Sequence, residues 1–310
     1  MLVTGGAGFI GSIVCRRLLE SGSSVRILDN FYHPDRERLD QISGHERIEI
    51  MEGDVRYRAA VDRAMRGVDR VAHLAALSTN KSVSDPSESF DVNLMGSQHV
   101  FASAGEHGVA RVVFASSASV YGDPKALPMT EDDRPDPQTP YCISKLAAEH
   151  ALAFHSRQYG FGWSALRFFN VYGPGQQTDA YYTSVVLTFL RRIARGEAPV
   201  IDGDGGQTMD FVHVEDVARS VILALDSTDT TGVLNVGTGT QTSIAELARI
   251  LIAHMGADIE PQFRPRDVLV AHREADITRI RDRLGWRPTI GVAEGLATVV
   301  DELKTSGRLD

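Results

Sequence analysis

The chain opens with Met1-Leu2-Val3-Thr4-Gly5-Gly6-Ala7-Gly8-Phe9-Ile10-Gly11, and this stretch decides the predicted fold. Residues 1–4 predict a short apolar strand, and the amphipathic run 13–20 predicts a helix. Between them, Gly5, Gly8 and Gly11 permit a tight turn, a close backbone approach to a pyrophosphate and close packing of the helix on the strand. The N-terminus of the helix adds free N–H groups for the phosphates. This order of strand, glycine turn and helix predicts a dinucleotide site.

A carboxylate in the next strand extends that prediction. Residues 25–28 predict a second apolar strand that ends in Asp29, about 18 residues beyond Gly11, where dinucleotide folds place an acid on the adenosine ribose hydroxyls. The same charge would repel a 2′-phosphate. The sequence therefore predicts NAD, and not NADP, as cofactor.

Further strands alternate with polar helical patterns. They are predicted at residues 47–51, 71–76, 112–115 and 163–169. This alternation predicts an α/β fold with a Rossmann-type doubly wound parallel sheet, whose ligands bind beyond the carboxyl ends of the strands. The serines of residues 116–119 fall at that edge. His73, on an apolar strand, is predicted to be a core histidine with satisfied hydrogen bonds.

The regular alternation breaks down after residue 171. We predict an NAD-binding Rossmann domain at residues 1–170 and a smaller C-terminal α/β lobe at residues 171–310 that mainly binds substrate. The absence of linker-like runs predicts that the two are tightly joined, with room for some segments to return to the first domain.

The stretch Thr139-Pro140-Tyr141-Cys142-Ile143-Ser144-Lys145 is predicted to carry the chemistry. Thr139 is typical of a helix N-cap and Pro140 of the first helical position, so Tyr141 and Lys145 share one helix face. A phenol with a pKa of about 10 is a poor base at neutral pH, and a nearby ammonium favours its phenolate. The pair is predicted to transfer a proton, although a Tyr and a Lys at this spacing also occur on many solvated helices.

Composition bounds the possible partners and the location. The chain has 310 residues and a formal net charge of −9, with dispersed acidic residues, which argues against a nucleic-acid or anionic-membrane surface. Cys15 and Cys142 form no CxxC motif and no histidine cluster has metal-ligand spacing, so we expect no disulfide, no metal and a reducing compartment. The N-terminus lacks the basic segment of a signal peptide and no apolar run could span a membrane, so the predicted location is cytoplasmic.

Short motifs run through nearly the whole chain: TGGAGFIG at 4–11, DN at 29–30, GDV at 53–55, HLAA at 73–76, SSASVYG at 116–122, YCISK at 141–145, RFFNVYGP at 167–174 and DFVHVED at 210–216. With these motifs the chain resembles the extended short-chain dehydrogenase/reductase superfamily, in its nucleotide-sugar 4-epimerase and dehydratase branch, which includes UDP-glucose/galactose 4-epimerases. The resemblance implies NAD as cofactor, a nucleotide-diphosphate sugar as substrate and a homodimer.

The resemblance also implies a role for individual residues. Tyr141 would act as general base and acid on the sugar 4-hydroxyl, Lys145 would lower its pKa and bind the nicotinamide ribose, and Ser117 would hydrogen-bond the same oxygen. The implied cofactor-binding residues are Gly5, Gly8, Phe9, Ile10, Gly11, Asp29, Asn30, Asp54, Val55, Leu74, Ala75, Ala76, Asn93, Ala115, Tyr141, Lys145 and Phe168. The implied substrate-binding residues are Ser117, Ser119, Tyr141, Phe169, Asn170, Gln176 and Arg264, with the loop 176–182 and a helix from Ser184 completing the sugar pocket.

The implied activity is 4-epimerisation of a UDP-hexose or UDP-hexuronate through a transient 4-keto sugar. The alternatives are a 4,6-dehydratase, a uronate decarboxylase and a non-catalytic NAD-binding regulator. Dehydratase relatives carry an Asp-Glu pair directly after the residue matching Ser117, where this chain has Ala118 and Ser119. This difference favours epimerisation over dehydration. The alternative is that an acid from elsewhere in the chain, such as Asp179, takes the place of that pair. Met209 stands where many relatives have an arginine, which removes one expected diphosphate contact.

The predicted homodimer has a pattern in its support. The helical regions 87–108 and 141–160 carry apolar side chains on more than one face, among them Phe101, Leu152 and Phe154. A helix that buries a single apolar stripe against a core needs fewer apolar side chains than these regions carry. Coverage of both faces within the monomer is the alternative.

Overall fold

The computed structural model describes residues 1–176, 185–228, 232–265 and 272–307. Its centre is a seven-stranded sheet in the order β11-β6-β5-β4-β1-β2-β3, with every neighbouring pair parallel. The strands are β1 (Leu2–Thr4), β2 (Val25–Asp29), β3 (Ile48–Glu52), β4 (Arg70–His73), β5 (Arg111–Ser117), β6 (Gly162–Phe168) and β11 (Gly232–Val236). The predicted Rossmann-type α/β fold is confirmed.

The strand order reverses beside β1. From this strand the chain proceeds through β2 to β3 on one side and through β4 and β5 to β6 on the other. The loops that follow the strands diverge at such a point and leave a crevice at the carboxyl edge of the sheet. The glycine turn after β1 lies at that edge.

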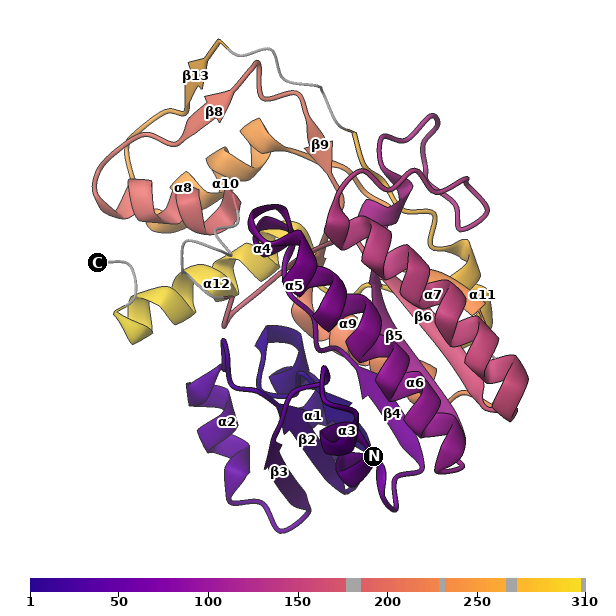
Figure 1. The fold of residues 1–310 in the computed structure, drawn as a ribbon. Coiled ribbons are helices and arrows are strands. Elements are labelled where there is room, and N and C mark those ends of the chain that lie inside the picture. The colour runs from indigo at the N-terminus through magenta and orange to yellow at the C-terminus, as the bar shows by residue number, and fades with distance from the viewer. Residues whose placement is uncertain (177–184, 229–231, 266–271, 308–310) are drawn as a thin grey trace.

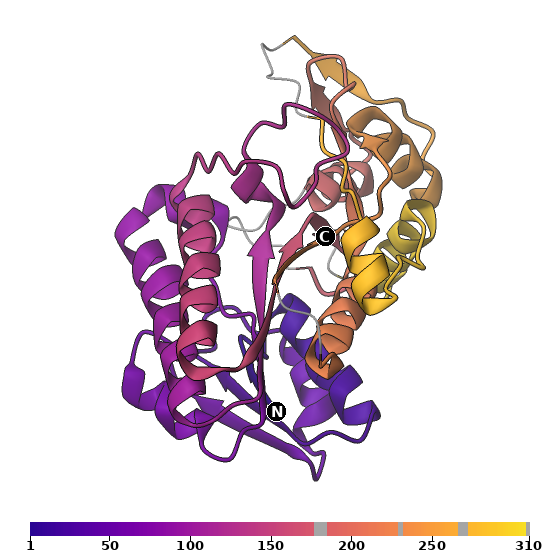
Figure 2. The ribbon, with the colours of Figure 1, turned by 90° about the vertical axis from the view of Figure 1, so that its right-hand side faces the viewer.

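Helices cover both faces of the sheet (Figures 1 and 2). One face packs against α1 (Phe9–Glu20), α2 (Arg36–Ser43), α9 (Val214–Asp226) and α11 (Thr278–Leu284). The other packs against α3 (Arg58–Met65), α6 (Ser97–Glu106) and α7 (Pro140–Tyr159). The shorter elements α4 (Thr79–Ser84), α5 (Pro86–Phe90) and the π-helix η1 (Asp91–Gly96) precede α6, and the 3-10 turn η2 (Ala118–Tyr121) follows β5. Among the described helices, none combines the length and apolarity needed to cross a bilayer.

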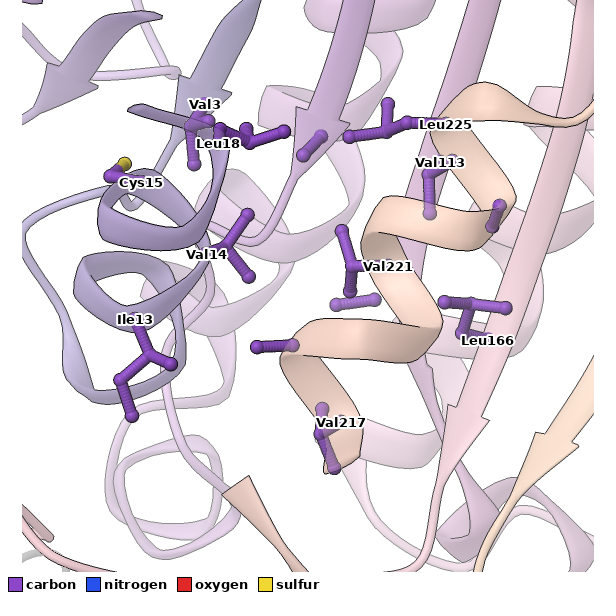
Figure 3. Packing of buried hydrophobic residues seen from close by; sticks show 14 of the residues in the cluster. Val3, Ile13, Val14, Cys15, Leu18, Val113, Leu166, Val217, Val221 and Leu225 are labelled. Carbon is purple, nitrogen blue, oxygen red and sulfur yellow. The ribbon is translucent and has the colours of Figure 1, made fainter. Parts of the chain in front are cut away.

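Alternation along the strands divides the core into two layers. Leu2 of β1 packs with the cluster under α3, α6 and α7, whereas its neighbour Val3 packs with α1 and α9. Figure 3 shows Val14 of α1 and Val221 of α9 facing the same apolar layer. Helix α9 comes from far along the chain, so this contact joins segments distant in the sequence in one core.

The start of α7 follows from its sequence. Thr139 is the N-cap and its Oγ1 accepts a hydrogen bond from the Cys142 N–H at 3.3 Å, while Pro140 occupies the first turn. The helix ends at Gly160, whose φ of 83° is left-handed. Tyr141 and Lys145 are thereby fixed in the first two turns. His73, as predicted, is buried, with its ring nitrogens bonded to the hydroxyls of Thr4 and Ser97.

A second lobe has its own apolar core, built largely from α8 (Val185–Ala194), α10 (Ile244–Met255) and α12 (Val292–Ser306). Its short strands are β7 (Asn170–Tyr172) with β10 (Phe211–His213), β8 (Val200–Asp202) with β13 (Gln262–Arg264), and β9 (Thr208–Met209) with β12 (Thr242–Ser243). Three described elements from beyond residue 171 lie with the first domain instead: β11 extends the sheet beside β6, and α9 and α11 pack on the face that α1 covers. The boundary at residue 171 as a functional division stays a prediction.

Candidate active site

A cavity of about 410 Å³ lies at the carboxyl edge of the sheet. The glycine turn forms its middle, Asp29 and Asp54 line it beyond β2 and β3, and Ser117, Tyr141 and Lys145 line it beyond β5. Residues distant in the sequence meet here because parallel strands all end at one edge.

At Gly5 and Gly11 the glycine turn is closed by contacts that leave no room for a side chain. A Cβ on Gly11 would stand 2.0 Å from the Gly5 carbonyl oxygen, and one on Gly5, whose φ is +70°, would stand 2.6 Å from the Ala75 nitrogen. Gly8 is the N-cap of α1 and offers no side-chain acceptor to its first N–H groups. The helix N-terminus therefore faces the cavity with free donors, which suits a pyrophosphate.

Two acids mark the end of the cavity near β2. Asp29 accepts hydrogen bonds from the Ala7 N–H at 3.0 Å and the Phe31 N–H at 2.8 Å, and burial raises the pKa of its carboxyl despite these donors. For Asp54, burial also acts to raise the pKa, but hydrogen bonds from Arg56 and Asn30 outweigh it, and the net shift is downward. Carboxylates held in this way can accept hydrogen bonds from ribose hydroxyls.

A buried cation marks the other end. Lys145 is almost fully buried, its Nζ donates to the Ala115 carbonyl at 2.7 Å, and Nζ lies 5.6 Å from the centre of the Tyr141 ring. Burial lowers the pKa of Lys145 to about 7, while the Glu149 carboxylate opposes this shift. The arrangement can place a positive charge beside the Tyr141 phenol, as a proton-transfer pair requires.

Ser117 presents its hydroxyl proton to this end of the cavity. Its Oγ accepts the Ser119 hydroxyl at 2.8 Å and the Ser119 N–H at 3.2 Å. Within the described ranges no acceptor for the Ser117 proton is found. The hydroxyl proton is therefore available to a ligand oxygen at this end of the cavity.

The structure brings most of the predicted site residues to this cavity. Those that line it are Gly5, Gly8, Phe9, Ile10, Gly11, Asp29, Asn30, Asp54, Val55, Leu74, Ala75, Ala76, Ala115, Ser117, Tyr141, Lys145, Phe168, Phe169 and Gln176. Ser119 lies behind Ser117 and bonds to it. The predicted residues 177–182 and Ser184 lie outside the described residues, as does Asp179.

Three other predicted residues do not line the cavity. Asn93 is buried, and its amide bonds to both the N–H and the carbonyl of Leu77, so it holds a lining segment in place. The Asn170 amide donates to the Asp210 carbonyl at 3.3 Å. Arg264, on β13, is exposed and pairs with Asp202 at 2.5 Å. Direct ligand contacts by these residues stay predictions.

Sequence reasoning missed several lining residues, which are Leu28, Tyr32, His33, Gly53, Leu77, Ser78, Thr79, Val92, Ser116 and Val171. Most directly follow or precede a predicted strand end, so a wider window at each strand terminus would have found them. The loop residues Tyr32 and His33 carried no periodic signal. Across the described ranges, no group of three or more His, Cys, Asp or Glu side chains is placed to hold a metal ion.

Comparison with known proteins supplies the family. The model of the NAD dependent epimerase/dehydratase family matches residues 1–237. The chain belongs to this family. It is 36% identical to a UDP-glucose 4-epimerase of Mycolicibacterium smegmatis, with 97% of each chain covered. Among solved structures it resembles a UDP-glucose 4-epimerase of Thermotoga maritima with UDP-glucose (TM-score 0.90, 34% identity, 98% of both chains) and one of Thermus thermophilus with NAD (TM-score 0.85, 34% identity, 98% of both chains).

NAD, the cofactor of this family, fits the residues present. The side-chain-free cradle of Gly5, Gly8 and Gly11 can hold the pyrophosphate at the N-terminus of α1. Asp29 can hold the adenosine ribose, and Lys145 can hold the ribose at the other end. When bound, NAD supplies a hydride acceptor and donor at the Tyr141 end.

Proposed function

We propose that this protein is an NAD-dependent 4-epimerase of a nucleotide-diphosphate sugar, of the UDP-hexose or UDP-hexuronate type. The observation that carries the proposal is the meeting of Tyr141, Lys145 and Ser117 at one end of a dinucleotide cradle. The two UDP-glucose 4-epimerase structures named above support it, because each is about a third identical to this chain over nearly its full length.

The proposed chemistry assigns each of these side chains a task. Tyr141, as phenolate, takes the proton from the sugar 4-hydroxyl while the C4 hydride leaves, and it returns that proton when the 4-keto sugar is reduced again. Ser117 donates a hydrogen bond to the same oxygen, which steadies the carbonyl that forms. Lys145 keeps the phenolate charged. Return of the hydride to the opposite face of the sugar inverts C4 and leaves no net oxidation.

The acids that line the cavity argue for epimerisation over elimination. Loss of water across C5 and C6 needs an acid and a base beside the keto sugar. Among the described lining residues the carboxylates are Asp29 and Asp54, both at the far end from Tyr141. Next to Ser117 stand Ala118 and Ser119, which cannot serve as carboxylic acids.

The second lobe is proposed to bind the nucleotide sugar. Gln176 supports this, because its Oε1 is buried and has no hydrogen-bond partner among the described residues, so it can accept a sugar hydroxyl. Phe169 lines the same side of the cavity. For Arg264 to contact the diphosphate, its pair with Asp202 must open, which costs little for a mostly exposed arginine.

We also propose a homodimer in the cytoplasm. Of the residues cited for assembly, Phe101 and Leu152 are buried within the monomer, because α6 and α7 pack on the sheet and on each other. Phe154 on α7 is 54% exposed and Met95 on η1 is 47% exposed. These large apolar side chains support a partner surface on the outer side of α7. Light scattering that shows a monomer at micromolar concentration would end this proposal.

The activity is tested by incubating the purified protein with UDP-hexoses and UDP-hexuronates and following the products by NMR. The expected product is the C4-inverted sugar, without added NAD if the cofactor co-purifies. Accumulation of a 4-keto-6-deoxy sugar would instead identify a dehydratase, and a pentose formed with carbon dioxide would identify a decarboxylase. No change in any sugar, with NAD bound, would support a regulatory role and overturn the proposal.

A further inference from the structure

A buried ion pair lies directly behind the proposed proton-transfer pair. Glu149 follows Lys145 by four residues on α7, as Lys145 follows Tyr141, so the three side chains occupy successive turns of one helix face. Glu149 and Lys145 are both almost fully buried. The carboxylate lies below the cavity, and it is not among the residues that line it.

Glu149 is held by partners from two strands. Arg167 of β6 donates to Oε1 through Nε at 2.9 Å and to Oε2 through Nη2 at 2.7 Å, and the Ser116 hydroxyl of β5 donates to Oε1. The guanidinium in turn lies over the Tyr121 ring, with Cζ 4.6 Å from the ring centre. This fork of hydrogen bonds fixes the position of the carboxylate.

Such a pair is poorly explained by stability alone. Removing two charges from water costs several kcal/mol per ion, and uncharged side chains of similar volume often serve as well or better. The simplest structural role for Glu149 would be to neutralise Arg167. Its place one turn from Lys145 indicates a second role.

Among the described residues, Glu149 is the carboxylate whose charge acts on Lys145. On β4, His73 is buried and its pKa is lowered to about 3, by burial first and then by Lys145, so it is neutral. On β5, Nζ contacts the Ala115 carbonyl and lies 4.8 Å from the centre of the Phe114 ring. Tyr141 completes the surroundings on α7. Burial drives Lys145 toward the neutral amine, and the Glu149 carboxylate is what opposes it.

We infer that Glu149 is a positioning residue for the proposed reaction, whose charge keeps Lys145 protonated and so keeps Tyr141 in the phenolate form. Tyr141 and Lys145 can share one proton in two ways, as phenol with amine or as phenolate with ammonium. A carboxylate on the lysine side favours the ammonium, so the base is ready before the sugar arrives. The kinetic part of this inference rests on the proposed function, but the titration of Tyr141 does not.

The test replaces Glu149 by glutamine in the holoenzyme. Glu149→Gln keeps the size of the side chain and an oxygen acceptor for Ser116 and Arg167. The ultraviolet absorption of phenolate is measured against pH in the parent protein and in Glu149→Gln. The signal of Tyr141 is obtained by subtracting the titration of the same protein that also carries Tyr141→Phe. Each unit of pKa is a tenfold change in population, and we expect the Tyr141 titration to move up by about one unit or more.

Kinetics give the second readout. In Glu149→Gln, kcat should fall about tenfold or more at neutral pH, with KM for the sugar nearly unchanged, since Glu149 does not reach the ligand. In the pH profile of kcat, the alkaline limb should move to lower pH, because Lys145 loses its proton more easily. Glu215→Gln is the matched control: Glu215 is also paired with arginine, in its case Arg16 and Arg17, but it lies on α9 and is not among the residues that line the cavity. It should leave both readouts unchanged.

A double variant separates the charge role from a structural one. Glu149→Gln with Arg167→Met removes the ion pair and leaves no unpaired charge, so it should fold even if the single variant does not. We expect this double variant to keep the low kcat and the raised pKa of Tyr141. Full recovery of kcat, or a Tyr141 titration like that of the parent protein, would overturn the inference. If the parent protein turns over no sugar, the proposed function fails, and the titration still decides the role of Glu149.

Discussion

The glycine turn allows a prediction in which neighbouring glycines behave differently. In Gly11→Ala the new Cβ would stand 2.0 Å from the Gly5 carbonyl oxygen and 2.8 Å from the Gly6 Cα, against an ordinary contact of 3.4 Å. The oxygen must move by about 1.4 Å, and because both atoms are backbone, no side-chain rotation relieves the clash. We expect a loss of about 1–3 kcal/mol in the free energy of unfolding. NAD affinity should fall at least tenfold, a change of about 1.4 kcal/mol, because the displaced turn is the pyrophosphate cradle.

Gly8→Ala should separate binding from folding. Among the described residues, the only heavy atom within 4 Å of its new Cβ, beyond the chain neighbours, is the Gly5 oxygen at 3.4 Å, and the φ of Gly8 is −82°. The free protein should accept the methyl group without loss of stability. Gly8 lines the cavity at the N-terminus of α1, however, so the methyl group stands where the pyrophosphate must approach. NAD binding alone should weaken.

The assay is thermal unfolding without added NAD, together with calorimetric titration of NAD into each stripped protein. Gly44→Ala is the control, because its Cβ meets no heavy atom within 4 Å and its φ is −87°. It should leave both quantities unchanged. An undiminished NAD affinity in Gly8→Ala, or undiminished stability in Gly11→Ala, would refute the reasoning from the geometry of the turn.

Three further predictions concern single side chains. Tyr141→Phe should lower kcat at least about a hundredfold, the usual scale of general acid–base assistance, with the melting temperature unchanged; a loss under about tenfold would remove Tyr141 as the base. Asp29→Ala should weaken NAD and relax discrimination against NADP in a binding titration, and equally tight binding of both cofactors by the parent protein would contradict the role of this carboxylate. Asp210→Ala should destabilise the protein by about 3 kcal/mol or more in urea, because the buried carboxylate accepts from the N–H groups of Thr238, Gly239 and Ala275 and from the Thr238 hydroxyl, and those donors would be stranded. A loss below about 1 kcal/mol, typical of an ordinary substitution, would show that water replaces the carboxylate.

The parts of the fold that sequence predicts well are those governed by local rules. The glycine turn, the carboxylate of Asp29 and the capped start of α7 each depend on residues a few positions apart. The return of β11 to the sheet depends instead on which edge is open, and β6 presents that edge only once the whole sheet exists. A short apolar run cannot carry this information.

Side-chain destinations were harder to predict than element positions. Asn93 belongs to a segment that reaches the cavity, but its amide turns inward to bond the Leu77 backbone, since a buried amide must satisfy both its donor and its acceptor. Glu149 and Arg167 are ordinary charged residues in the sequence, 18 positions apart. Only the packing of α7 on β6 makes them a pair. Phe101 and Leu152 show the converse, since the sequence does not tell which of the apolar faces is covered within the monomer, and both residues are.

The charged groups around the cavity differ between its two ends, so they can orient a bound dinucleotide. Asp29 and Asp54 stand at one end, the uncapped N-terminus of α1 lies in the middle, and Lys145 stands at the other end. A dinucleotide presents hydroxyl donors on both riboses and two negative phosphates between them, so the central charge is satisfied only over α1. The remaining choice is which ribose meets the acids. Only the ribose beside Tyr141 can carry the group that exchanges hydride with a sugar bound there, so the adenosine ribose must meet Asp29. The polarity that orients the cofactor therefore also keeps carboxylates away from the reacting carbon. Among the described lining residues no carboxylate stands beside Tyr141, and this supports the proposed return of the hydride over elimination.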